Sequence, residues 1–106
     1  MTDFVIVLTT FPADGDVEQF ASRLVDERLA ACVNVLPVMR SIYRWKNVVE
    51  RADERQLVIK TTGECVASLE SLLAKLHPYE VPEFLVIPVN GGSQGYLAWL
   101  TENSGP

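Results

Sequence analysis

The residues best suited to chemistry lie together in one short run, His77-Pro-Tyr-Glu-Val-Pro-Glu83. This run places an imidazole, a phenol and two carboxylates side by side, and it contains the only histidine of the chain. Its two prolines fix φ and push His77 and Val81 toward extended backbone, which favours a rigid connector over a mobile loop. A rigid polar segment is a place where a binding site can be built.

A metal centre is the first chemistry that these residues suggest. Copper and zinc sites take three or four nitrogen or sulfur donors, supplemented by carboxylates. We therefore consider His77, Cys32 and Glu80 as candidate metal ligands, with missing donors supplied by neighbouring copies of the chain. The alternatives are that His77 caps the preceding helix and bonds locally, and that Cys32 packs against a sheet.

A cleft for a small anionic ligand is the second possibility. Lys60 interrupts an apolar strand, and with Tyr43, Trp45, Tyr79 and Glu80 it could line a pocket between subunits. The alternative is a lysine that reaches solvent or pairs with a carboxylate.

Catalysis has weaker support, because a nucleophile needs a base within hydrogen-bond reach and the chain has a single histidine. Glu80 and Glu83 are candidates for a hydrolytic role, but no glycine-rich phosphate loop follows the first expected strand, where Thr9-Thr-Phe-Pro-Ala13 stands instead. We predict a protein that is not an enzyme and requires no cofactor.

Composition narrows the class of protein. Hydrophobic residues make up 48% of the 106 residues and charged residues 22%, which indicates one globular domain spanning residues 1–106. The net charge of -5 argues against nucleic-acid binding, which depends on clustered Lys and Arg. We see no signal peptide and no apolar run of membrane-spanning length, and therefore expect a cytoplasmic protein without membrane contact.

The spacing of apolar residues predicts four strands and three helices. We expect strands at residues 4–10, 32–45, 48–61 and 84–89, and helices at residues 17–29, 66–76 and 96–102. Asp14 or Asp16 can cap the first helix, and Thr61 with Glu64 fits a capping box before the second. The order predicts an α+β fold, a ferredoxin-like β-α-β-β-α-β sandwich with a short C-terminal helix.

The two middle strands predict a hairpin too long for one domain. Lys46-Asn47 suits the tight turn, and Pro37 must lie at an edge or a bulge. Strands of about 14 residues reach roughly 45–50 Å, whereas a domain of this length is roughly 35 Å across. The far end would expose a set of apolar side chains, namely Ile42, Tyr43, Trp45, Val48 and Val49. We predict a homo-oligomer joined by its hairpins, unless Pro37 and Ser41 bend the strands back onto the domain.

Five motifs in order connect the sequence to a known family. They are Leu29-Ala-Ala-Cys-Val-Asn-Val-Leu-Pro37, Ser41-Ile-Tyr-Arg-Trp45, Ile59-Lys-Thr61, the run from His77 to Glu83, and Tyr96-Leu-Ala-Trp99. Together they resemble the CutA divalent-cation tolerance family over residues 4–100. The resemblance implies a ferredoxin-like homotrimer, similar in arrangement to PII signalling proteins, with a role in copper tolerance and no established reaction.

Two departures from the family pattern bear on its site. The hairpin tip has Trp45-Lys-Asn47 where the family usually has Trp-x-Gly. Three copper ligands have been proposed in some members, and only the one at His77 is present here, because Thr9 and Leu76 occupy the other two positions. The resemblance thus implies weak divalent-metal (copper) or small-ligand binding in clefts between subunits. The alternative is a PII-like module that senses an anionic metabolite and signals to an unidentified protein partner.

Overall fold

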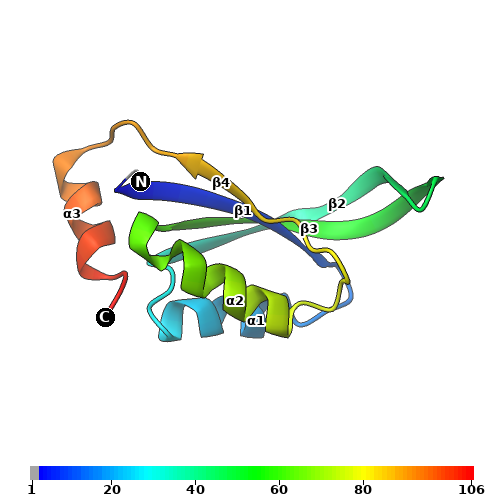
Figure 1. Ribbon diagram of the computed structural model, residues 1–106, viewed down its shortest axis with the longest axis horizontal. Coiled ribbons are helices and arrows are strands. Elements are labelled where there is room, and N and C mark those ends of the chain that lie inside the picture. The colour runs from blue at the N-terminus through cyan, green and yellow to red at the C-terminus, as the bar shows by residue number, and fades with distance from the viewer. Residues whose placement is uncertain (1–2) are drawn as a thin grey trace.

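A computed structural model describes residues 3–106, and it has the predicted order of elements (Figure 1). The elements are β1 (Phe4–Pro12), α1 (Val17–Asp26), β2 (Cys32–Trp45), β3 (Val48–Thr62), the 3-10 turn η1 (Gly63–Cys65), α2 (Val66–Leu76), β4 (Leu85–Pro88) and α3 (Gln94–Glu102). The α+β prediction is therefore confirmed.

The strands form one antiparallel sheet in the order β2-β3-β1-β4. Helices α1 and α2 lie on one face of this sheet, and α3 lies near the end where β1 begins (Figure 1). The core forms where the helices meet the two central strands, through side chains such as Val7, Leu24, Leu57, Ile59 and Leu69. Because successive side chains of a strand point to opposite faces, the residues between these core positions of β3 lie on the opposite side of the sheet.

The long hairpin projects beyond the rest of the molecule (Figure 1). Lys46 and Asn47 both have left-handed backbone, with φ of 50° and 67°, which confirms the tight turn. The β2–β3 register shifts between Val35 and Val38, so the predicted bulge surrounds Pro37. The longest dimension of the molecule is 44 Å, less than the extended-strand estimate for the hairpin alone, because a bulge and strand twist shorten the strands.

The hairpin does not fold back onto its own domain. Beyond the bulge, Ile42 is 64% exposed and Val48 is 55% exposed. The alternative in which Pro37 and Ser41 bend the strands onto the core is therefore wrong.

The first helix begins as predicted and ends early. The Asp16 carboxylate accepts a hydrogen bond from the Gln19 N–H at 3.1 Å and caps α1. The helix stops at Asp26 because Arg28 adopts left-handed backbone with φ of 60°. The Arg28 guanidinium donates hydrogen bonds of 2.6 Å to the carbonyls of Glu102 and Gly105, and the Gly105 N–H donates to the Arg28 carbonyl at 2.7 Å. This Arg28 clasp joins the end of α1 to the C-terminus.

The predicted capping box before α2 is wrong. Thr61 lies inside β3, which continues to Thr62, and its hydroxyl donates to the Leu29 carbonyl at 2.8 Å. The helix follows η1 instead, and Thr62, the residue before η1, makes no side-chain capping bond. Cys65 is buried at this turn.

The last two elements differ from prediction by one or two residues at their ends. β4 is limited to Leu85–Pro88, two residues shorter than expected. α3 begins at Gln94 because the Ser93 hydroxyl accepts the Tyr96 N–H at 3.3 Å and caps the helix there.

Candidate functional site

The connector, residues 77–84, is anchored by a buried histidine. His77 is the C-cap residue of α2, and its backbone N–H donates to the Leu73 carbonyl at 2.8 Å. Its imidazole Nε2 lies 2.6 Å from the Thr10 carbonyl oxygen, and Nδ1 lies 3.1 Å from the Tyr79 backbone N. A carbonyl only accepts and a backbone N–H only donates, so Nε2 carries the proton and Nδ1 accepts. Both ring nitrogens are therefore engaged: the bond to Tyr79 is local, as the alternative expected, whereas the bond to Thr10 spans 67 positions.

Aromatic rings surround this imidazole. The ring centroids of Phe11 and Tyr79 lie 5.2 Å and 4.8 Å from that of His77, and Phe20 lies at 6.2 Å. His77 is only 7% exposed. The apolar surroundings and the two hydrogen bonds hold the connector against the end of β1.

The Tyr79 hydroxyl donates a hydrogen bond of 2.7 Å to Oε2 of Glu54 on β3. Burial of the phenol, and then the hydrogen bond and the charge of the Glu54 carboxylate, raise the pKa of Tyr79 well above its usual value. Glu54 itself is 6% exposed. Within residues 3–106, no lysine, arginine or histidine nitrogen lies within 4.0 Å of its carboxylate.

A second polar contact fixes the far end of the connector. The Gln56 side-chain amide donates to the Glu83 carboxylate at 2.9 Å and to the Thr9 carbonyl at 2.8 Å. β1, β3 and the connector are thereby tied together at one point, next to the pair of Tyr79 and Glu54.

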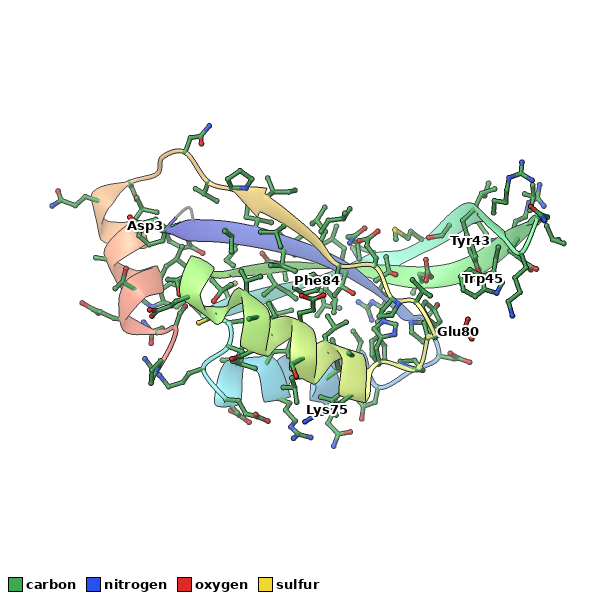
Figure 2. All side chains as sticks on the ribbon, viewed as in Figure 1. Asp3, Tyr43, Trp45, Lys75, Glu80 and Phe84 are labelled. Carbon is green, nitrogen blue, oxygen red and sulfur yellow. The ribbon has the colours of Figure 1, made fainter. Side chains whose placement is uncertain are left out.

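A pocket of about 810 Å³ opens between the connector and the distal hairpin, which we define as residues 38–55. Its size is typical of small-molecule sites. Figure 2 shows Tyr43 and Trp45 on the distal hairpin and Glu80 on the connector, at the same end of the molecule. The lining residues with polar or aromatic side chains are Thr10, Ser41, Tyr43, Trp45, Lys46, Glu54, Gln56, Tyr79, Glu80 and Glu83. The ionisable carboxylates number three against one lysine, so the pocket is acidic.

Comparison with known proteins identifies the fold family. The family model described as CutA1 divalent ion tolerance protein matches residues 5–103. The chain belongs to the CutA family. The divalent-cation tolerance protein CutA of Thermus thermophilus is 44% identical over 100 residues, which cover 94% of this chain and 97% of that one.

CutA structures also share the whole fold. The Thermus thermophilus structure aligns with a TM-score of 0.92 at 43% identity, covering 96% of this chain and 99% of that one. The CutA1 structure from Oryza sativa aligns with a TM-score of 0.93 at 33% identity, covering 98% and 95% of the two chains. A CutA from Archaeoglobus fulgidus, 30% identical with a TM-score of 0.89 over 94% and 97% of the chains, is described as periplasmic. No helix in the described residues is long and apolar enough to span a membrane, and a cytoplasmic location for this CutA stays a prediction.

This CutA chain brings together four of the five residues predicted for the cleft. Tyr43, Trp45, Tyr79 and Glu80 all line the pocket, whereas Lys60 does not. Lys60 lies six residues beyond Glu54 on the same side of β3, about 20 Å along the strand. Within one chain Lys60 is therefore outside this pocket, and its place in a cleft between subunits stays a prediction.

The three predicted metal ligands lie apart in this CutA chain. Cys32 pairs in register with Lys60, whereas His77 contacts Thr10, which pairs with Gln56 about 13 Å further along β3. Glu80 is exposed and lines the pocket. Across residues 3–106 no three His, Cys, Asp or Glu side chains are grouped so that they could hold a metal ion. A metal centre at His77, Cys32 and Glu80 stays a prediction that needs donors from other chains.

Sequence reasoning missed Glu54 and Gln56. Both lie in a polar stretch of β3, Arg51-Ala-Asp-Glu-Arg-Gln56, that looks like an ordinary solvated strand. The connector that covers them is far away along the chain, because Tyr79 reaches Glu54 across 25 positions and Glu83 reaches Gln56 across 27. Finding either residue from the sequence would have required knowing the register of the strands.

Proposed function

We propose that this CutA protein contributes to tolerance of divalent cations as a homotrimer, without catalysing a reaction. We also propose that its intersubunit clefts bind copper or a small ligand weakly. Family membership supports the tolerance role, since the relatives carry that description. The sole histidine has both nitrogens engaged, which leaves no free imidazole base for hydrolysis near Glu80.

The exposed distal hairpin is the observation that carries the assembly. Ile42, Val48 and Val49 are exposed on a projecting ribbon, and Leu85 and Ile87 are exposed on β4. β2 and β4 are also the two edge strands of the sheet. An exposed apolar ribbon with an open edge is an association surface.

The difference between the two edges favours a ring. A contact of β2 with β4 of another copy would join unlike surfaces, and such head-to-tail contacts close into cyclic assemblies when the rotation allows it. A trimer is the smallest ring of this kind and agrees with the arrangement that the family resemblance implies.

Analytical ultracentrifugation at micromolar concentration tests the assembly. We expect a mass about three times that of the 11.8 kDa chain. Val48→Glu and Val49→Glu place a charge on opposite faces of the distal hairpin, so at least one should dissociate the trimer. Val25→Glu, on the exposed face of α1, is the matched control and should stay trimeric. A monomeric parent protein, or two hairpin variants that both remain trimeric, would refute the proposed assembly.

Copper binding is tested separately by calorimetry. Glu80 is the one predicted ligand whose side chain is exposed at the pocket, so Glu80→Gln should weaken copper binding. Glu70→Gln, an exposed position on α2, controls for the loss of charge. Equal copper affinity in both variants would remove Glu80 from the site.

The acidic pocket favours this proposal over an anion sensor of the PII kind. Glu54, Glu80 and Glu83 face a ligand there, with Lys46 as the only cationic side chain among the lining residues that the structure describes. An anionic metabolite would meet repulsion from these carboxylates.

A further inference from the structure

We propose that the pocket between the connector and the distal hairpin binds an organic ammonium ion, held by the Glu54 carboxylate. This inference rests on the small-ligand part of the proposed function and names the chemical class of the ligand.

Glu54 is a buried carboxylate that lacks a positive partner. Its Oε2 accepts the Tyr79 hydroxyl, but no donor to Oε1 is present in the part of the chain that the structure describes. Burial of a charged group is costly unless a counter-charge or hydrogen bonds compensate. Because Glu54 lines the pocket, a ligand cation can reach the open oxygen and supply the missing charge.

The Tyr79 phenol keeps its proton, because burial and the neighbouring carboxylate raise its pKa. It therefore remains a donor to Oε2 and leaves Oε1 as the acceptor for a ligand. A protonated amine, which donates hydrogen bonds and carries charge, matches an open carboxylate oxygen.

The hairpin end of the pocket is aromatic. Tyr43 and Trp45 are two residues apart on β2 and point to the same side of the distal hairpin as Glu54, further toward its tip. The Lys46 ammonium lies 5.7 Å from the Trp45 ring centroid, within the range of a cation–π contact. Because Trp45 already has this cation beside it, the charge of the ligand is assigned to Glu54.

The volume and the donors distinguish an organic cation from a bare metal ion. A pocket of about 810 Å³ is far larger than an ion needs, and it holds room for an apolar body beside the charge. No group of three metal-ligating side chains is present between residues 3 and 106. An amine with an apolar portion places its charge at the Glu54 carboxylate and its body against apolar lining residues such as Met39 and Ile42.

Three probes of matched shape test the charge requirement: phenethylamine, 2-phenylethanol and 3-phenylpropionate. Calorimetry on the intact protein should show binding of phenethylamine, with the alcohol and the acid at least tenfold weaker, since hydrogen bonds to a charged group are worth about 1.5–3 kcal/mol. Equal binding of amine and alcohol, or no binding of the amine, would overturn the proposal.

Two variants assign the charge to Glu54. Glu54→Gln keeps an oxygen that can accept the Tyr79 hydroxyl, and it should lower the affinity for phenethylamine at least tenfold. Glu70→Gln should leave this affinity unchanged. Unchanged affinity in Glu54→Gln would remove Glu54 from the site. The probe comparison on the parent protein does not depend on either variant folding.

The sedimentation mass and the copper titration of the same samples separate this inference from the proposed function. A trimer that binds copper and no amine refutes the inference alone. If the protein binds the amine but is monomeric, the proposed assembly is refuted and the inference is supported. If it binds the amine but not copper, the proposed metal site is refuted and the inference is again supported.

Discussion

The hydrogen bond between Tyr79 and Glu54 makes a quantitative prediction about stability. Tyr79→Phe removes the 2.7 Å bond and leaves the carboxylate of Glu54, a residue that is 6% exposed, without this donor. A hydrogen bond to a charged group contributes about 1.5–3 kcal/mol, so we expect the free energy of unfolding at pH 7 to fall by about that amount. In urea this loss shifts the midpoint by about 1 M.

The matched control is Tyr96→Phe. Tyr96 is exposed on α3, and its hydroxyl makes no hydrogen bond within the described residues, so its loss should change stability by less than about 0.5 kcal/mol. Both variants and the parent protein should be unfolded at one protein concentration, because the stability of an oligomer depends on concentration. If Tyr79→Phe costs no more than Tyr96→Phe, the reasoning about Glu54 is refuted.

The pH dependence provides a second test of the same bond. The folded protein raises the pKa of Tyr79 above the ordinary value of 10.0, so the unfolded chain loses the phenol proton first. The contribution of Tyr79 is therefore complete below pH 10 and is lost as the pH rises above it, at up to about 1.4 kcal/mol per pH unit. The free energy of unfolding of Tyr79→Phe should therefore fall less steeply above pH 10 than that of the parent protein. If both fall in parallel, Tyr79 is not the group responsible.

Three further predictions concern backbone conformation and helix capping. Gly105→Ala should destabilise the fold by about 1–2 kcal/mol in thermal unfolding, because φ is +82° and an added Cβ would lie 2.9 Å from the Glu64 carboxylate. Gly95→Ala, in open space within α3, should instead be neutral or stabilising by up to about 1 kcal/mol. Asp16→Ala should cost about 0.5–2 kcal/mol through loss of the bond to the Gln19 N–H, and a variant as stable as the parent would exclude the cap.

Local chemistry made much of the fold predictable. The Asp16 cap, the turn at Lys46-Asn47 and the bulge at Pro37 each depend on the conformational preferences of a few adjacent residues. The capping box at Thr61 failed because β3 continues through Thr62 and the 3-10 turn η1 follows it, so Thr61 is not the residue before the helix. Where β3 ends depends on its pairing with β1, which the sequence alone does not give.

The site was predictable only in part, for the same reason. The connector stood out because its polar residues and prolines are adjacent in sequence, and Tyr79 and Glu80 do line the pocket. Glu54 gave no signal because its burial is created by residues about 25 positions away. The registers of β1 and β2 against β3 put Lys60 at the other end of the same chain, so its place in a cleft between subunits stays a prediction.

The Arg28 clasp has a consequence for the order of folding. Arg28 occupies a left-handed backbone conformation that is costly for a residue with a side chain, and its partners are the carbonyls of Glu102 and Gly105. These partners lie 74 and 77 positions further along the chain. Because closing so long a loop costs conformational entropy before the contact forms, we expect the turn after α1 to settle late, after the strands have paired.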